Sequence, residues 1–229
     1  MSSKSREQHS TPGVYAFMMC GCALVAYAGL MLPLLDNVPR TIQFESIDWR
    51  GSNPTEIVSQ TGTIATLSDR SRANWIRGKE ISLTGSVIQS WFIHSIYFRN
   101  SNTAYVIDDQ HRSVHVIPCD CTFEQDGVPE DALCLGASRR VRGLTYVGSG
   151  EVAGFPVTRY RAVNTSEVLT ISFAPTLHCQ VMDLSEIVFG LGREKSYTRF
   201  IITEYASGKP SLSVFVPPSE YRYQTTPPW

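Results

Sequence analysis

The sequence predicts a single N-terminal transmembrane helix followed by a mainly-β domain. The helix is predicted because residues 13–35, GVYAFMMCGCALVAYAGLMLPLL, carry no charge and match the ~20 apolar residues that cross a hydrocarbon core. The β domain is predicted because runs rich in Val, Ile, Thr and aromatic residues recur between polar turns from residue 56 onward. About 190 residues follow the helix, enough for one sizeable domain with an appendage.

A secretory leader is the alternative interpretation of this apolar segment. Two basic residues precede it, and Ala26-Tyr27-Ala28 resembles the small-x-small pattern of a cleavage site. The apolar run continues through residues 30–35, longer than a leader core, which favours a retained helix. Small residues at helical spacing are predicted to pack this helix against other transmembrane helices: Cys22, Ala26 and Gly29.

Topology and location are predicted from charge and from the cysteines. Basic residues flank the apolar segment on both sides, so the positive-inside rule barely sets its orientation. A short polar N-terminus ahead of a large domain favours N-inside topology, and an even number of cysteines in the polar domain permits disulfides in an oxidising space. We therefore expect an inner-type membrane, mitochondrial inner or bacterial cytoplasmic, with the C-terminal domain in the intermembrane space or periplasm.

Composition divides the chain into six expected parts. They are a polar tail 1–12, the transmembrane helix 13–35, a connector 36–77, a β-barrel 78–163, an α+β extension 164–217 and an extended tail 218–229. In the extension, "DLSEIVFGLG" is expected to be a short helix, and "YTRFIITEY" with "SLSVFVPP" a hairpin. The connector holds one short extended piece, "TIQFESIDW".

The barrel region is expected to contain three strands, a short helix and two more strands. The strands lie in "EISLTGSVIQSW", "TAYVIDD", "SVHVIP", "SRRVRGLTYVG" and "VTRYRAV", and Pro129 begins a helix that Gly136 ends. Gly85 falls mid-strand, where a long first strand would bend. This order resembles the OB-fold, a five-stranded Greek-key barrel, at the level of the superfold only. Another small antiparallel barrel or sandwich is the alternative.

One cluster of residues combines zinc-ligand types: His111, His115, Cys119 and Cys121. A single residue separates the two cysteines, unlike the C-x₂₋₄-C knuckles of zinc sites. A strand would also spread His115 and Cys119 over ~13 Å. We therefore expect no metal and no cofactor. We expect instead a disulfide among Cys119, Cys121, Cys134 and Cys179, with Cys134 joined to Cys119 or Cys121 as the first choice.

The sequence contains no recognisable catalytic motif. It lacks a G-x-S-x-G elbow, and "GSGEVAG" lacks the G-K-[ST] end of a phosphate loop. The chain has 20 basic and 21 acidic residues, which is unlike a nucleic-acid binder. We therefore expect a non-catalytic accessory subunit of a membrane protein complex, with other membrane subunits and the lipid bilayer as partners. The alternatives are a membrane-anchored assembly factor or chaperone, and an OB-type module that binds a ligand or nucleic acid.

The C-terminal tail, "PSEYRYQTTPPW", is predicted to bind a partner. It presents three aromatic residues between prolines: Tyr221, Tyr223 and Trp229. Prolines lower the entropy lost on ordering, and Tyr and Trp are common binding hot spots. A disordered end that contacts nothing is the alternative.

Overall fold

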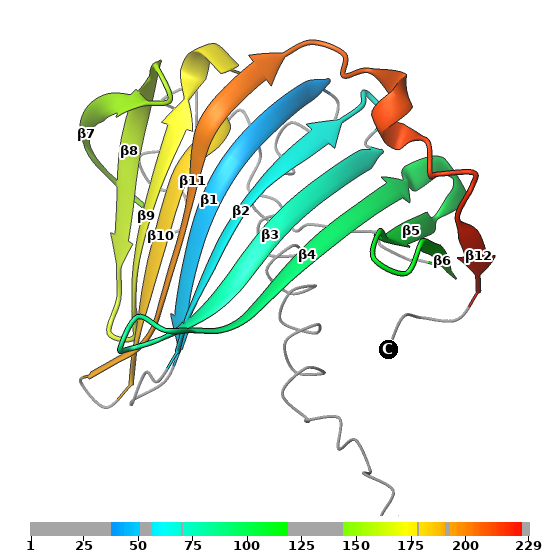
Figure 1. The fold of residues 1–229 in the computed structure, drawn as a ribbon. Coiled ribbons are helices and arrows are strands. Elements are labelled where there is room, and N and C mark those ends of the chain that lie inside the picture. Colours follow the sequence, from blue (N-terminus) through cyan, green and yellow to red (C-terminus); the bar gives the residue numbers. More distant parts are fainter. Residues whose placement is uncertain are drawn as a thin grey trace, which may run out of the picture.

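Twelve strands lie side by side in one sheet, shown in Figure 1. This computed structural model describes residues 38–50, 56–69, 71–118, 144–177, 179–190 and 193–225. The order across the sheet is β12-β6-β5-β4-β3-β2-β1-β11-β10-β9-β8-β7. Neighbouring strands are antiparallel, except that β12 runs parallel to β6.

Most of the strands are long. Their bounds are β1 Arg40–Arg50, β2 Glu56–Thr66, β3 Arg72–Ser82, β4 Val87–Phe98, β5 Thr103–Asp108, β6 Ser113–Pro118, β7 Thr145–Val152, β8 Phe155–Val163, β9 Glu167–Ala174, β10 Gln180–Gly190, β11 Arg193–Ser207 and β12 Arg222–Gln224. Three short 3₁₀ turns join them: η2 Arg99–Ser101, η4 Pro175–Leu177 and η5 Leu212–Phe215. Among the described elements there is no α-helix.

The two faces of the sheet differ in burial. In β1, Ile42 and Phe44 are buried while Gln43 and Glu45 between them are exposed. Because successive side chains of a strand point to opposite faces and directly paired residues share a face, this alternation extends to the neighbouring strands. We call the face that carries Ile42 and Phe44 the inner face, and the opposite one the outer face.

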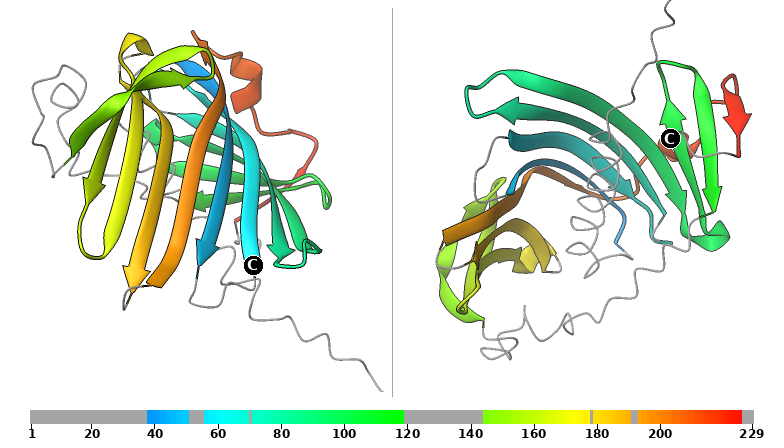
Figure 2. Two further views of the ribbon diagram at one scale, coloured as in Figure 1. Left: turned by 90° about the vertical axis from the view of Figure 1, so that its left-hand side faces the viewer. Right: turned by 90° about the horizontal axis from the view of Figure 1, so that it is seen from below.

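The sheet curves toward its inner face. Phe155 on β8 and Tyr205 on β11 are three strands apart, which would separate them by ~14 Å in a flat sheet. Their ring centroids lie 5.8 Å apart, and Tyr205 pairs with Ile42. Open sheets of more than ~10 strands rarely stay flat. Figure 2 shows the resulting arch from below, in its right-hand view.

Two glycines permit close packing at the centre of the inner face. A Cβ on Gly62 would lie 2.7 Å from the carbonyl oxygen of Trp75 and 2.8 Å from the Phe44 ring. A Cβ on Gly78 would lie 2.1 Å from the Trp91 ring. Phe44 and Trp91 are the cross-strand partners of these glycines. Each aromatic ring therefore covers a glycine of the next strand, an arrangement that suits a strongly curved sheet.

The C-terminal segment covers part of the outer face. Phe215 of η5 is buried against Ala73, Ile96 and other residues of β2 to β6. The chain then continues to β12, which adds a short parallel strand beside β6 at the edge of the sheet. The segment therefore completes a small second core on the outer face of this half of the sheet.

The predicted fold class, a transmembrane helix followed by an OB-like barrel with an α+β extension, is wrong. The described residues form one open sheet, and within them no helix is long and apolar enough to cross a membrane. The predicted location, single-pass and N-inside in an inner-type membrane, is not supported by the described residues. Residues 1–37, which include Cys22, Ala26 and Gly29, lie outside the described residues. The fold that the structure does show is mostly β.

The structure differs from the predicted barrel at three places in the chain. Gly85 does not bend a strand, since it has φ +84° in the hairpin turn that joins β3 to β4. The segment expected as a helix, "DLSEIVFGLG", lies largely in β10, where hydrogen bonds to β9 and β11 override helix-like capping signals. Residues 40–50, assigned to a connector, form β1 between β2 and β11.

Candidate functional site

A stripe of apolar side chains crosses the inner face from β8 to β4. On one half of the sheet its members pair directly, strand by strand: Tyr160, Ile171, Leu184 and Phe200. On β11 the row moves from Phe200 to Ile202, two residues along the same strand. On the other half of the sheet it continues with Ile202, Phe44, Ile76 and Ile93. Strand β2 contributes Gly62, which lies between Phe44 and Ile76. We call these eight side chains the inner stripe. All except the partly buried Ile93 are at most 8% exposed.

A row with several polar residues borders one side of the inner stripe. Toward the end of β1, Thr198 Oγ1 donates a hydrogen bond of 2.8 Å to Asp48 Oδ1, and the same row contains Glu186 and Glu80. On the other side the neighbouring row starts with Tyr205, Ile42 and Ile64. It becomes polar only on β3 and β4, where Asn74 Nδ2 donates to Ser95 Oγ at 3.2 Å. The apolar strip of the inner face therefore has a hydrogen-bonded polar row along one side only.

The inner stripe is long, and its side chains are buried although few of the described elements lie over it. Seven steps between strands correspond to ~34 Å along the curved sheet. Near one rim, Phe155 of the β7–β8 hairpin and Leu177 of η4 pack against it. No α-helix or second sheet of the described ranges lies over the stripe. A sheet normally buries its apolar face against another layer or a ligand. The arrangement is therefore suited to holding an elongated apolar molecule.

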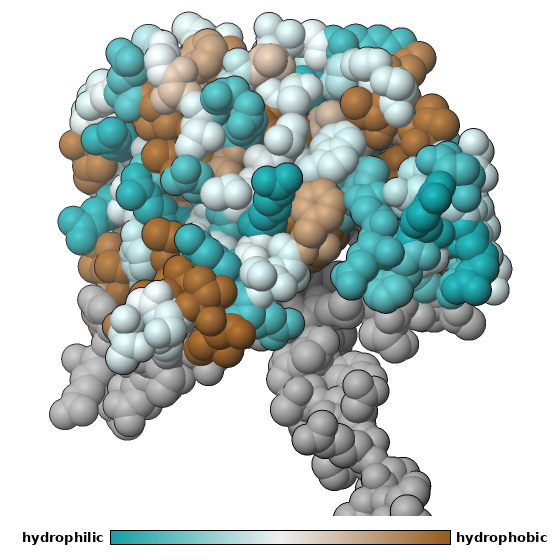
Figure 3. All heavy atoms as spheres, in the orientation of Figure 1, coloured by the Kyte–Doolittle hydropathy of each residue, from teal (hydrophilic) through white to brown (hydrophobic). Residues whose placement is uncertain are grey.

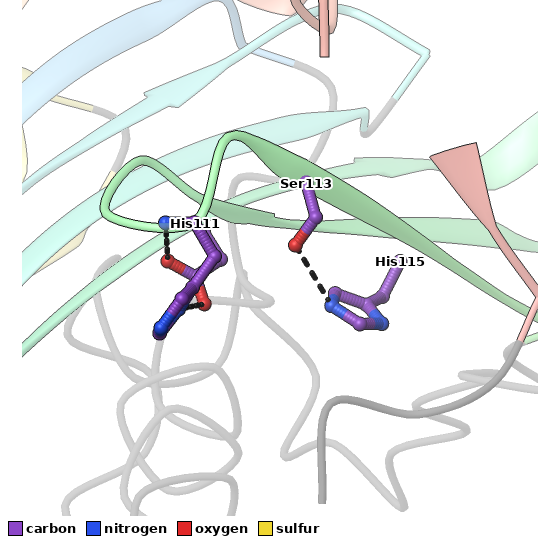
Figure 4. A network of polar contacts seen from close by, with 4 residues as sticks. His111, Ser113 and His115 are labelled. Carbon is purple, nitrogen blue, oxygen red and sulfur yellow. Dashed lines mark hydrogen bonds and ion pairs between the residues drawn. The ribbon is translucent and has the colours of Figure 1, made fainter. Parts of the chain in front are cut away.

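The two histidines of the cluster of zinc-ligand types lie apart, as Figure 4 shows. His111 occupies the β5–β6 turn, where its backbone N–H donates to Asp108 Oδ1 at 2.9 Å and its Nδ1 lies 2.7 Å from Asp108 Oδ2. His115 is buried on β6 with Nε2 3.2 Å from Ser113 Oγ. Burial alone would raise the pKa of Asp108, but the hydrogen bonds from His111 outweigh it and lower that pKa. Within the described residues no group of three potential metal ligands occurs.

The remaining predicted residues are only partly described. Cys179 lies between η4 and β10 and is disulfide-bonded. The five other cysteines, Cys119, Cys121 and Cys134 among them, lie outside the described residues, so the pairing stays a prediction. Tyr221 Oη donates to Asp109 Oδ1 at 3.0 Å and Arg112 lies over its ring. Tyr223 is 47% exposed on β12, and Trp229 lies outside the described residues.

One histidine that the sequence did not single out has a perturbed environment. His94 stacks on Trp75 with ring centroids 5.1 Å apart, and its Nδ1 lies 3.7 Å from Asp109 Oδ2. Burial lowers the pKa of His94, and the nearby carboxylate of Asp109 opposes this only in part. Asp109 also binds Tyr221 of the C-terminal segment, so His94 belongs to the packing of that segment on the outer face.

Comparisons with known proteins identify no family. No family model and no curated protein matches the chain. Among solved structures, the chain is similar to LprF from Mycobacterium bovis (8% identity, 85% of this chain and 98% of that chain, TM-score 0.41). It is also similar to a putative outer membrane lipoprotein-sorting protein domain from Vibrio parahaemolyticus (7% identity, 83% of this chain and 94% of that chain, TM-score 0.22). A DUF1329 family protein from Desulfovibrio piger gives 12% identity, 85% and 96% coverage, and a TM-score of 0.30. With TM-scores below 0.5, these similarities establish neither family nor function.

The predicted function is wrong together with the fold on which it rested. An accessory subunit of a membrane complex was expected because an anchored OB-like barrel carried no site, and the described residues form an open arch instead. The two alternatives, an anchored assembly factor and an OB-type binding module, depended on the same barrel. Sequence reasoning missed the inner stripe, although the alternation in "TIQFESIDW" contains its signal.

Proposed function

We propose that the protein binds the acyl chains of lipids along the inner stripe and that it acts as a carrier, without catalysing a reaction. The observation that carries this proposal is the continuous apolar strip on the concave face of one sheet. Burial of each CH₂ group of a ligand contributes about 0.8 kcal/mol. Ten buried methylenes would therefore contribute about 8 kcal/mol before the cost of ordering the ligand.

The dimensions of the inner stripe support an acyl chain as the ligand. A bilayer core of about 30 Å contains two leaflets, so one chain spans about 15 Å. The stripe extends over about twice that length. The row that contains Asp48 and Thr198 offers hydrogen-bonding groups to a polar headgroup on one side of the stripe.

A titration of the delipidated full chain with a dansyl-labelled fatty acid tests the proposal. Ile93→Gln places an amide in the partly buried end of the inner stripe and should weaken binding about tenfold, because a polar group is then desolvated by the chain. Phe92→Gln is the matched control, since Phe92 is the neighbouring residue on the same strand but is 45% exposed on the outer face. The control should bind within twofold of the unaltered protein.

Two results would overturn the proposal. One is the absence of saturable binding to the unaltered, folded protein. The other is equal weakening by Ile93→Gln and Phe92→Gln when circular dichroism shows both variants to be folded. Mass spectrometry of an organic extract provides an independent check, because protein purified without detergent should release stoichiometric acyl lipid.

A further inference from the structure

A second apolar row runs along the outer face, near the edge at which β1 ends. Its members stand directly opposite one another across eight consecutive strands from β8 to β4: Val163, Val168, Ile187, Tyr197, Trp49, Ile57, Ile81 and Val87. We call this row the outer belt. A single row that is apolar in eight strands with widely different positions in the sequence is unusual for a solvent-facing surface, where polar residues normally alternate with the core.

The outer belt is accessible. Val163 is 65% and Val87 is 59% exposed, and the other six are partly buried. The β3–β4 hairpin tip extends the belt with Leu83 and Ile88, which are 62% and 53% exposed. Figure 3 shows hydrophobic side chains gathered near the lower edge of this face. Contiguous exposed apolar surface of this kind marks a site of contact with a protein or a membrane.

The next row of the outer face is polar and basic. It also runs strand by strand: Arg161, Thr170, Ser185, Arg199, Ile47, Ser59, Lys79 and Ser90. Three of these residues are cations and none is an anion. The row lies two residues further along each strand, ~7 Å from the outer belt. Arg199 also binds Asp183, with Nε 3.3 Å from Oδ1.

A cavity of 760 Å³ opens at the level of this basic row. Its lining includes Lys79 and Arg77 together with the hydroxyl groups of Ser59, Thr61 and Ser90, against a single acid, Glu45. The Arg77 guanidinium lies 5.8 Å from the centroid of the Phe92 ring. Ligand cavities commonly measure about 300–1,000 Å³. Two cations and three hydroxyls make this cavity complementary to a phosphate-bearing headgroup.

We propose that the outer belt docks the protein on the surface of an anionic phospholipid bilayer, with headgroups in the basic cavity beside it. Trp and Tyr are the residues enriched at membrane–water interfaces, and here Trp49 pairs with Tyr197 at the middle of the belt. Basic residues just above an apolar surface add attraction to anionic lipid. A protein partner is less well matched, because Lys is depleted in protein–protein interfaces. The inference does not depend on acyl-chain binding, which uses the opposite face.

The experiment uses the full chain with vesicles of phosphatidylcholine and phosphatidylglycerol at 7:3 that contain a trace of a diazirine-labelled phosphatidylglycerol. After irradiation, mass spectrometry locates the labelled peptides. Peptides that contain Trp49, Tyr197 or Val87 should be labelled. R77Q/K79Q should reduce this labelling at least fivefold, whereas R99Q/K209Q, which removes two exposed cations elsewhere, should leave it unchanged. Mapped labelling distinguishes the belt from any other segment that contacts lipid.

Three outcomes would overturn the proposal. One is the absence of label on belt peptides while other peptides are labelled, and another is equal labelling in vesicles of phosphatidylcholine alone. The third is a belt that stays unlabelled in a chain that forms dimers, which would make this face a protein interface. V87S/L83S provides a second variant at an exposed turn, where the fold tolerates polar residues. It should reduce labelling at least threefold, and L212S/V216S is its control.

Discussion

The inner stripe and the outer belt are built from similar residues in the same strands, yet their surroundings differ. Both consist of eight apolar side chains that cross the sheet from β8 to β4. The inner side chains are buried beside a hydrogen-bonded polar row, whereas the outer ones are partly exposed beside a row that contains three cations. Composition alone therefore does not assign a role to an apolar surface. Burial and flanking charge separate an acyl-chain site from a docking surface.

The largest expected contrast between the two faces is in stability, and β10 offers a matched pair. Leu184 is 1% exposed in the inner stripe, so Leu184→Ala should lower the free energy of unfolding by about 3 kcal/mol. Ile187 lies three residues further along β10 in the partly exposed outer belt, so Ile187→Ala should cost about 1 kcal/mol or less. Urea denaturation of both variants measures the contrast. Equal losses would show that the two faces are buried alike.

A smaller effect is expected from filling the space beside an inner-face glycine. Gly62→Ala places a Cβ 2.7 Å from a backbone oxygen that cannot move freely, and overpacking of this kind costs about 1–3 kcal/mol. Ser59→Ala, on the outer face of the same strand, should change the free energy of unfolding by less than about 0.5 kcal/mol. Thermal denaturation of the two variants compares them. An unchanged midpoint for Gly62→Ala would contradict the packing of Phe44 over this glycine.

The smallest expected effect is the pH dependence that His94 contributes where the C-terminal segment covers the outer face. Burial lowers the folded-state pKa of His94 below 6.5, so the unfolded chain takes up a proton first as the pH falls. The stability that the neutral ring contributes is complete above pH 6.5 and is lost as the pH falls below that value. Between pH 7.5 and pH 5.5, the free energy of unfolding measured by denaturation should fall less for His94→Phe than for the unaltered chain. Asp109→Asn should show a larger loss, because Asp109 opposes the effect of burial.

Local strand signals in the sequence were sufficient for part of this fold. The sequence predicted the strands that became β5 and β6 with the polar turn between them, and the extended segments of β8 and β11. These segments alternate apolar and β-branched residues and are bounded by turn formers, so their signal lies within a few neighbouring residues. Where capping signals and β propensity competed, as in β10, pairing on both sides decided the outcome.

The arrangement of strands could not be predicted in the same way. Trp49 and Tyr197 are direct partners although the sequence between them includes most of the sheet. Neither the inner stripe nor the outer belt exists in any single segment, because each strand contributes about one side chain to each row. Only the register between strands turns these scattered residues into continuous surfaces, and a shift of one residue would exchange the two faces.

A crystal structure of the full chain with a brominated fatty acid is the decisive test of acyl-chain binding, because anomalous scattering from bromine locates the acyl chain. We expect bromine peaks on the concave side of the sheet, within van der Waals distance of Phe44, Ile76 or Leu184. Bromine peaks confined to the outer face, or no ordered fatty acid at saturating concentration, would contradict it.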